Sequence, residues 1–417
     1  MLATLCLGST FGCANLNAET PPTTGTPHPE LRPFDTLALQ FIEEYGVPGM
    51  SLAVAKNGNL VLARGYGWSD QHAEEPVQPD TRFRIASVSK PVTAFAVTQL
   101  IDQGKIDLDT PVLRQFLSEA AALTEEPKDP RWNHITPRHL LQHTAGFDRK
   151  ASFDPMFRSR SIASAQDVPP PADGRAITRH MLGRDLDFDP GTQYAYSNFG
   201  YLLLGQLIES VTHQDYETYV REEVLERMNI RDMALGRTLL DHRSPKESRY
   251  YASGLGPSVF ESTAPIVPRP YGAWFLEPMA AHGGWIATAT DLVRLAAALD
   301  DSNIRPFSEE ALDLMIEAPT GSVGHDDDGS RKDVYYGFGW KVRHVNDQGD
   351  VNLWHLGSLD GTSSILVRRY DGLVWAALFN SRARVGPESQ EPAAAIDSLL
   401  HRAAAQVVEW PEGTPLF

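Results

Sequence analysis

The chain has 417 residues, 42% of them hydrophobic, which is enough to bury a large core in one or two domains. Its 37 Lys and Arg against 54 Asp and Glu give a net charge of -17, which repels phosphate backbones and anionic lipid and argues against nucleic acid as a partner. No run of 18 or more apolar residues occurs, so no membrane-spanning helix is expected.

The opening segment contains both cysteines, Cys6 and Cys13, so the rest of the chain has no thiol for a disulfide, a metal site or a nucleophile. "LATLCLGSTFGCANLNAE" resembles the later part of a secretory signal, although no Lys or Arg precedes Arg32. We expect residues 1–30 to be a signal-like segment and linker, with export to a bacterial periplasm and Cys13 as a candidate lipid anchor. The alternative is a disordered tail on a cytoplasmic protein.

The next elements in chain order are a helix and a pair of strands. Apolar residues recur at helical spacing from Leu31 to Glu44. "GVPGMSLAVAKNGNLVLARGYG" then predicts two strands joined by a hairpin at Asn57-Gly58. "FRIASVSKPVTAFAVTQLIDQGK" (83–105) predicts a strand end followed by an all-apolar helix.

The middle of the chain has helical patterns. The Pro-rich region from Asp148 to Asp173 predicts a surface loop, and helices return in "RAITRHMLGRD" and "NFGYLLLGQLIESVTHQDYETYVREEVLERM". Leu240 to Pro270 is polar and rich in Pro and Gly, and "GWIATATDLVRLAAAL" predicts another helix with Thr290 or Asp291 near its start.

The last part returns to strands. "YYGFGWKVRHV", "NLWHLGSLDGTSSILVRRY" and "GLVWAALFNS" are three β-type runs, and "PAAAIDSLLHRAAAQVVEW" predicts a closing helix. Strands at both ends with helices between predict an α/β (α+β) fold: an antiparallel sheet flanked by helices, with an inserted all-helical domain. We assign residues 31–85 plus 275–417 to the sheet domain and 86–274 to the mostly helical insertion, with the active site at their interface.

Ser87 and Lys90 form a candidate nucleophile and base. Their spacing places both side chains on one face if a helix begins near Ser87. The helix dipole and burial beside apolar residues both disfavour a charged lysine in the first turn, so its pKa should fall toward neutrality and let it accept a proton from serine. Pro91 costs little there because first-turn amides have no helical partner.

Alone, S-x-x-K is a weak signal, since about one or two matches arise by chance in a chain this long. Two further segments supply other parts of a serine hydrolase. "YAYSNFG" presents Tyr196 and Asn198 before a helix, although Asn198 also fits an N-cap and Tyr196 a core position. "LWHLGSLDG" places His355 on a strand before Gly357, where a substrate backbone could approach closely; a packed histidine at a strand-end turn is the alternative.

Together, these three elements resemble the serine β-lactamase and penicillin-binding protein superfamily, whose signature is S-x-x-K, then S-x-N or Y-x-N, then K-T-G or a variant. The similarity is strongest to the class C branch, with family VIII carboxylesterases closest, and extends roughly from Leu31 to Ser381 through "ITPRHLLQHTAGF", "GGWIATATDLVRL" and "WHLGSLDGT". The resemblance implies the β-lactamase/transpeptidase-like fold.

The resemblance also implies roles for the site residues. Ser87 would be the acylated nucleophile, Lys90 its proton partner and Tyr196 the general base or acid shared with Lys90. Asn198 would hold a substrate carbonyl. The backbone N–H groups of Ser87 and Ser358 would form the oxyanion hole. No metal ion or organic cofactor is expected.

The departure from the family pattern is His355, where β-lactamases and transpeptidases usually carry a lysine that supports recognition of a substrate carboxylate. A neutral imidazole attracts an anion less at pH 7. We therefore expect a carboxylesterase acting on short-chain or aromatic esters, with weak β-lactam hydrolysis. The alternatives are a D-amino-acid peptidase or β-lactamase acting on cell-wall-like amides, and a penicillin-binding sensor or scaffold that acylates without turnover.

One histidine pair has the spacing of a metal site. His139 and His143 in "RHLLQH" have a spacing that can bind zinc, but no Glu lies between them to act as a general base. We expect surface or capping histidines there, and a small-molecule ester or amide as the partner of this protein. The sequence leaves the oligomeric state open.

Overall fold

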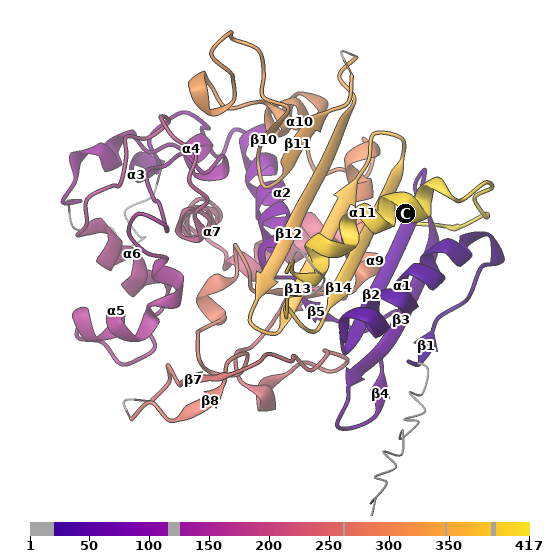
Figure 1. Ribbon diagram of the computed structural model, residues 1–417. Coiled ribbons are helices and arrows are strands. Elements are labelled where there is room, and N and C mark those ends of the chain that lie inside the picture. Colours follow the sequence, from indigo (N-terminus) through magenta and orange to yellow (C-terminus); the bar gives the residue numbers. More distant parts are fainter. Residues whose placement is uncertain (1–20, 116–125, 262, 347, 385–388) are drawn as a thin grey trace, which may run out of the picture.

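The computed structural model describes residues 21–115, 126–261, 263–346, 348–384 and 389–417 (Figure 1). Cys13 and the rest of the signal-like segment up to residue 20 lie outside the described residues. Within the described ranges, no helix combines the length and the apolar character needed to cross a membrane.

The main sheet is antiparallel and is built from both ends of the chain. Its strand order is β1-β3-β2-β14-β13-β12-β11-β10, and β4 and β15 also pair with β3. Its strands are β1 Thr23–Thr24, β2 Gly49–Lys56, β3 Asn59–Asp70, β4 Glu75–Pro76, β10 Val334–Tyr336, β11 Lys341–His344, β12 Val351–Leu359, β13 Thr362–Arg368, β14 Leu373–Phe379 and β15 Thr414–Pro415. The predicted antiparallel sheet flanked by helices is confirmed.

Two small sheets lie apart from the main one. Their strands are β5 Phe83–Arg84, β6 Ala234–Leu235 and β9 Trp285–Ala287 in one, and β7 Leu255–Pro257 and β8 Ile266–Pro268 in the other. β9 pairs with both β5 and β6, so the segment leading to Ser87 is hydrogen-bonded to a strand from late in the chain. The domain boundaries at residues 85/86 and 274/275 stay predictions.

The α-helices cover the sheet and fill the middle of the chain. They are α1 Arg32–Tyr45, α2 Ser89–Asp102, α3 Val112–Gln115, α4 Pro137–Leu141, α5 Ser159–Ala165, α6 Gly174–Leu182, α7 Asn198–Thr212, α8 Tyr216–Tyr219, α9 Ala289–Ala297, α10 Glu309–Ile316 and α11 Pro392–Ala405. The long helical pattern after residue 198 is divided among α7, α8, a π-helix, η5 Val220–Leu225, and a 3₁₀ turn, η6 Glu226–Met228. α7 ends where His213 adopts a left-handed conformation.

The predicted hairpin at Asn57-Gly58 is confirmed. Both residues have positive φ, 51° and 76°, as a two-residue turn between twisted strands requires. The three late β-type runs form five strands, because turns interrupt two of them. One of these is the turn at Gly361, where φ is 87° and β12 folds back onto β13.

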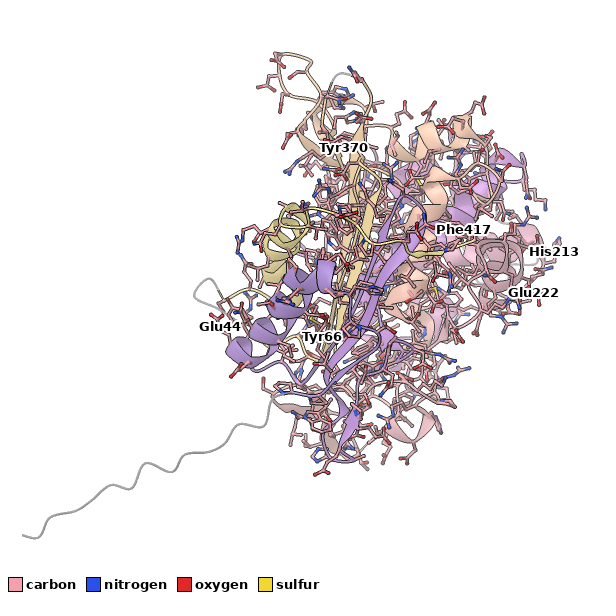
Figure 2. All side chains as sticks on the ribbon, turned by 90° about the vertical axis from the view of Figure 1, so that its right-hand side faces the viewer. Glu44, Tyr66, His213, Glu222, Tyr370 and Phe417 are labelled. Carbon is pink, nitrogen blue, oxygen red and sulfur yellow. The ribbon has the colours of Figure 1, made fainter. Side chains whose placement is uncertain are left out.

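Both faces of the sheet are covered, and the central strand β14 is apolar and buried along its whole length. Leu52 and Val54 of β2 pack in the cluster under α1 and α11, whereas Ala53 and Ala55 face the cluster that contains α9. Tyr66 of β3 lies on the α1 side of the sheet (Figure 2). Its hydroxyl donates to Asp35 Oδ1 at 2.6 Å. Its phenol therefore links the sheet to the first helix.

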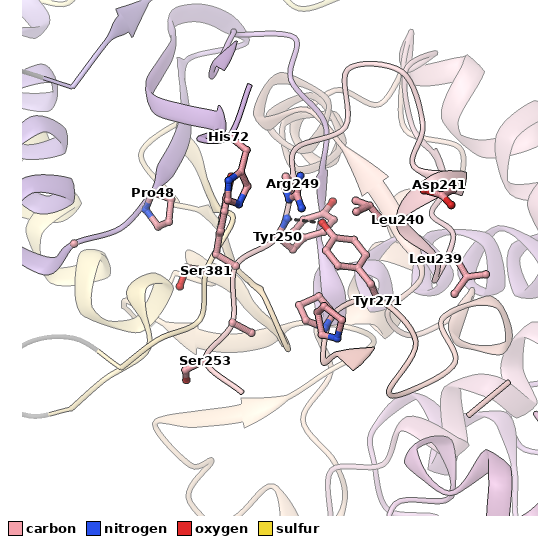
Figure 3. A pocket seen from close by; sticks show the side chains of 15 residues that line it. Pro48, His72, Leu239, Leu240, Asp241, Arg249, Tyr250, Ser253, Tyr271 and Ser381 are labelled. Atoms are coloured by element: carbon pink, nitrogen blue, oxygen red, sulfur yellow. Dashed lines mark hydrogen bonds between the residues drawn. The ribbon is translucent and has the colours of Figure 1, made fainter. Parts of the chain in front are cut away.

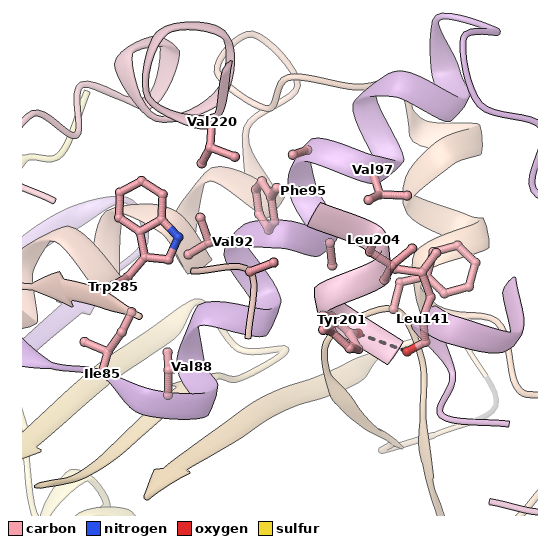
Figure 4. Packing of buried hydrophobic residues seen from close by; sticks show 14 of the residues in the cluster. Ile85, Val88, Val92, Phe95, Val97, Leu141, Tyr201, Leu204, Val220 and Trp285 are labelled. Carbon is pink, nitrogen blue, oxygen red and sulfur yellow. Dashed lines mark hydrogen bonds between the residues drawn. The ribbon is translucent and has the colours of Figure 1, made fainter. Parts of the chain in front are cut away.

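The helix after the S-x-x-K motif is enclosed by the protein. Every residue of α2 from Ser89 to Leu100 is buried, which explains its lack of a polar face. Val92, Phe95 and Val97 of α2 pack with residues of α7 and with Val220 and Trp285 in one continuous core (Figure 4). The surrounding core thus fixes the position of α2 without any ligand.

The Pro-rich region from Asp148 to Asp173 is not a simple surface loop. It contains α5 and a 3₁₀ turn, η4 Pro155–Phe157, and it buries Met156 and Ile162 in the core. The seven residues of α5 are too few for a clear helical pattern, and their burial comes from tertiary packing. Asp154 lies immediately before η4 and caps it, because its side chain accepts from the Met156 N–H.

A close backbone contact joins β12 to the segment before Ser87. A Cβ atom built on Gly357 would lie 2.2 Å from the carbonyl oxygen of Ile85 and 2.2 Å from Ser364 Oγ. Ser364 Oγ in turn donates to the Ile85 carbonyl at 2.7 Å. Gly357 is therefore required by contacts inside the protein, a reason that differs from the substrate approach expected from the sequence.

We expect Gly357→Ala to lower the free energy of unfolding by about 2 kcal/mol or more, because the added methyl group displaces packed backbone. Urea denaturation followed by circular dichroism measures this change. Gly183→Ala is the matched control: Gly183 is exposed, has a φ of -76°, and its nearest Cβ contact would be 3.5 Å. The control should stay within about 1 kcal/mol of wild type; equal losses in the two variants would contradict the packing argument.

Candidate active site

The predicted site residues meet at one cleft of about 500 Å³. It lies where the start of α2, the turn before α7 and the end of β12 converge. Register between β11 and β12 begins at the pair Lys341–Trp354, so residues 355–359 extend past β11 into the cleft. The predicted residues that line it are Ser87, Tyr196, Asn198, His355, Gly357 and Ser358.

Ser87 lies in a strand-to-helix junction, as the sequence predicts. It is the middle residue of a 3₁₀ turn, η2 Ala86–Val88, between β5 and α2. Ala86 just before it has a φ of 47°, a left-handed conformation that costs a non-glycine residue about 1 kcal/mol or more. Thr362 Oγ1 donates to the Arg84 carbonyl at 2.6 Å, so β13 holds the backbone that leads into this strained turn.

Lys90 lies behind Ser87 and is completely buried. Its Nζ is 3.4 Å from Ser87 Oγ, 2.8 Å from Asn198 Oδ1 and 3.1 Å from the His282 carbonyl oxygen. Burial lowers the pKa of Lys90 well below that of a free lysine, and the nearby Asp154 carboxylate opposes this shift. The neutral amine predicted from the sequence is therefore favoured by the surroundings of Lys90.

Tyr196 lies beside Lys90, whose Nζ is 4.6 Å from the centre of the tyrosine ring. Burial raises the pKa of Tyr196 above its usual range, while a hydrogen bond with Ser87 and the positive charge of Arg149 lower it by smaller amounts. The Arg149 guanidinium carbon is 4.8 Å from the same ring centre. Tyr196 is thus a protonated phenol at neutral pH.

Asn198 is the first residue of α7, and its side chain belongs to the cleft. The N-cap of this helix is Ser197, whose hydroxyl accepts from the Gly200 N–H at 3.2 Å, so the capping alternative for Asn198 is wrong. Asn198 Oδ1 accepts from Lys90, and Nδ2 donates to Asp154 Oδ2 at 2.7 Å. One amide therefore bridges a lysine and a carboxylate.

His355 is buried and fixed in place. Its Nδ1 is 2.7 Å from the Leu356 carbonyl oxygen, and its Nε2 is 2.8 Å from the Tyr336 hydroxyl. A carbonyl only accepts, so Nδ1 carries the proton and Nε2 accepts from Tyr336. Burial, reinforced by Lys90, lowers the pKa of His355 to about 3, which leaves the imidazole neutral at pH 7.

Three residues of the site were not predicted. Asp154 lies in the Pro-rich segment 148–173, and Tyr336 lies in a β-type run that forms β10. His143 was grouped with His139 as a surface or capping residue. His139 Nδ1 indeed accepts from the Thr136 N–H in a capping box, but His143 is buried.

His143 packs at the back of the cleft. The centre of its ring is 4.3 Å from that of Tyr196 and 4.4 Å from that of Tyr336, and its Nδ1 accepts from the Ser197 N–H at 3.2 Å. His143 has a φ of 59°, and no periodicity in the sequence reports such a turn. Among the residues that the structure describes, no three His, Cys, Asp or Glu side chains are grouped to hold a metal ion.

Size alone does not identify the site. A second cavity of about 610 Å³, lined among others by His72, Arg249, Tyr250 and Tyr271, is larger than the cleft at Ser87 (Figure 3). It contains none of the predicted catalytic residues. The cleft is distinguished by its chemistry, because it joins a serine, a desolvated lysine and a buried tyrosine.

Comparison with known proteins places the chain in a family. The family model described as Beta-lactamase matches residues 34–399. A probable fimbrial assembly protein FimD, serogroup H1, of Dichelobacter nodosus is 33% identical over 266 residues, which are 63% of this chain and 60% of that protein. The match thus spans less than two thirds of that relative.

Two solved structures share the fold. The D-amino acid amidase from Ochrobactrum anthropi SV3 has a TM-score of 0.65 at 22% identity, covering 91% of this chain and 98% of that one. The penicillin binding protein from Bacillus halodurans has a TM-score of 0.64 at 21% identity, covering 88% and 99%. With the family match over most of its length, the chain belongs to the beta-lactamase family, and the two solved structures show that it shares their fold.

Proposed function

We propose that this protein is a carboxylesterase that hydrolyses short-chain or aromatic esters through an acyl-enzyme on Ser87, with weak β-lactam hydrolysis. The observation that carries this proposal is the state of His355. It occupies the position where β-lactamases and transpeptidases usually carry a lysine, yet it is neutral and its Nε2 already accepts from Tyr336. A substrate carboxylate finds no cation there, so neutral esters are favoured.

The proposed chemistry begins with Ser87. Its oxygen attacks the ester carbonyl, and its proton passes to the neutral amine of Lys90, directly or through the phenol of Tyr196. The same proton then goes to the departing alcohol, which leaves an acyl group on Ser87. Water attacks this ester in the second half, so the acid is released and the serine is restored. No metal ion or organic cofactor is called for.

Backbone and amide donors would hold the carbonyl group of the substrate. The N–H groups of Ser87 and Ser358 are the proposed oxyanion hole, and both residues line the cleft. One N–H of the Asn198 amide is committed to Asp154, so the second N–H is the one that could donate to a substrate carbonyl. The partner of this site would be a small ester or amide.

A second candidate is a hydrolase of cell-wall-like amides, such as a D-amino-acid peptidase or a β-lactamase. It is favoured by Arg149 and Lys341, two cations at the rim of the cleft that make no ion pair within the described parts of the chain. The third cation of the rim, Arg382, is bonded to Asp360 at 2.6 Å. The rim could therefore attract a carboxylate even though His355 does not.

We expect Ser87→Ala to reduce turnover of p-nitrophenyl butyrate by at least about a thousandfold, because the acyl-enzyme cannot form. Initial rates of nitrophenol release measure the loss, and intact-mass spectra should show a butyryl adduct of +70 Da on wild type alone. Ser89→Ala is the control: its buried hydroxyl accepts from the Trp285 N–H, two residues from Ser87. Turnover that survives in Ser87→Ala would disprove the assignment.

The same experiment with nitrocefin and a D-Ala-D-Ala peptide separates the alternatives. Faster turnover of the peptide or of nitrocefin than of the ester would favour the amide hydrolase. A stable adduct on Ser87 without turnover of any substrate would indicate a sensor or scaffold.

We expect His355→Lys to raise kcat/KM for nitrocefin, relative to p-nitrophenyl butyrate, by about tenfold or more, because it places a cation where the family usually has one. His355→Gln is the neutral control, since its amide can still accept from Tyr336. Steady-state kinetics with both substrates give the ratio. An unchanged ratio in His355→Lys would show that this position does not set the preference between neutral and anionic substrates.

A further inference from the structure

Asp154 lies outside every motif that predicts this site, yet its carboxylate is bonded into the cleft. Oδ1 accepts from the Met156 N–H at 3.1 Å and thereby caps the turn η4. Oδ2 accepts from Asn198 Nδ2 at 2.7 Å. One oxygen therefore stabilises local structure, and the other contacts a predicted substrate-binding residue.

The bond to Asp154 determines which way the Asn198 amide points. A carboxylate can only accept a hydrogen bond from this amide, so the NH₂ group faces Asp154 and Oδ1 faces Lys90 Nζ at 2.8 Å. If the amide were rotated by 180°, its oxygen would face the carboxylate and its NH₂ group would face the amine. Asp154 thus makes one orientation of Asn198 strongly preferred.

Asp154 is also the acidic group that acts on Lys90. The three atoms bonded to Lys90 Nζ are a hydroxyl, an amide oxygen and a carbonyl oxygen, and none of them carries a formal charge. The negative charge of Asp154, one amide away, favours the protonated amine, and the positive charge of Arg149 disfavours it. The two residues therefore act on Lys90 in opposite directions.

The other titratable groups near Lys90 carry no charge at neutral pH. Burial lowers the pKa of the surrounding histidines, which are His143, His282 and His355. Burial raises the pKa of the surrounding tyrosines, which are Tyr196, Tyr201 and Tyr336. Burial also raises the pKa of Asp154, and its hydrogen bonds from Asn198 and from the Met156 N–H oppose this rise and favour the carboxylate. Asp154 and Arg149 are thus the charges that these described surroundings apply to Lys90.

We propose that Asp154 is a positioning residue of the active site: its carboxylate orients the Asn198 amide toward Lys90 and supplies the counter-charge for Lys90 across that amide. This role rests on the proposed acyl transfer at Ser87. It adds a fourth side chain to the proton-handling group of Ser87, Lys90 and Tyr196, and it acts through Asn198 without touching the substrate.

Asp154→Asn tests the proposal with little disturbance of the fold. Asparagine caps a turn about as well as aspartate, so the bond to the Met156 N–H can be kept while the charge is lost. We expect the acylation rate at its pH plateau to fall about tenfold, because the Asn198 amide is no longer held in one orientation. Stopped-flow release of nitrophenol from p-nitrophenyl butyrate measures this rate.

The pH profile separates this role from a purely structural one. Lys90 must be neutral to accept the serine proton, so activity is lost as pH falls through its pKa. Removing the negative charge lowers that pKa, so the acid limb of kcat/KM should move to lower pH by about half a unit to one unit in Asp154→Asn. Arg149→Gln removes a positive charge and should move the limb to higher pH.

The control is Asp173→Asn. Asp173 caps α6 in the same manner, accepting from the Ala176 N–H at 2.8 Å, and it does not line the cleft. It should leave both the rate and the profile unchanged. Thermal melting reports whether each variant folds, and Asp154→Ser, which keeps a capping oxygen, replaces Asp154→Asn if that variant does not.

The outcomes distinguish the two proposals. Absence of a Ser87-dependent acyl-enzyme in wild type would contradict the proposed function. The role of Asp154 alone would be overturned by a different result. In that case wild type forms the acyl-enzyme on Ser87, and the folded Asp154 variant has the same acylation rate and the same acid limb as wild type. A slower plateau with limbs shifted in opposite directions by Asp154→Asn and Arg149→Gln would support it.

Discussion

The site depends on a lysine that has been removed from water. Lys90 is completely buried at the start of a helix that is itself enclosed by the core. A buried ammonium without a directly bonded carboxylate is costly, and the amine lowers that cost by releasing its proton. The packing of α2 against the rest of the core therefore has a chemical consequence, because it keeps water away from Nζ and keeps Nζ beside Ser87.

A second buried basic residue, Arg84, precedes Ser87 by three positions. Arg84 donates to the carbonyl oxygens of Pro270 and Arg237 at 2.8 and 2.7 Å, and its guanidinium carbon is 4.5 Å from the centre of the Tyr250 ring. An arginine stays charged in a protein, so it can tie β5 to the polar segment 237–270 but cannot accept a proton. Lysine can lose its charge, and Lys90 occupies the position next to Ser87, the proposed nucleophile.

The sequence could predict the part of the site that lies in short local motifs. Two short motifs at element boundaries contain Ser87 and Lys90, and Tyr196 and Asn198. Within each motif the separation in sequence determines how close the two side chains lie. The structure brings the two motifs together. The sheet order was partly predictable from a hairpin and alternating strands. The pairing of β14 with β2, between residues more than 300 positions apart, was not encoded in any local pattern.

The residues that were missed act through contacts distant in sequence. Asp154 reaches Asn198 across 44 positions, and Tyr336 reaches His355 across 19. Asp154 looked like one of many acidic residues in a Pro-rich stretch, and only tertiary packing places its carboxylate beside an amide. His143 had the right residue type for function, but its burial depends on a left-handed backbone turn that its spacing to His139 does not indicate.

The charged side chains of the cleft lie at its rim, whereas His355 in its interior is neutral. This arrangement affects which substrates the cleft attracts. Inside, burial keeps His355 neutral, while Tyr336 and the Leu356 carbonyl hold its ring in place, so this position offers no cation to a substrate carboxylate. Arg149 at the rim is exposed, where salt screens its attraction within about 8 to 10 Å. Attraction of anionic substrates would therefore weaken as salt is added. The proposed proton transfer at the buried Lys90 would be screened much less, so turnover of a neutral ester should depend little on ionic strength.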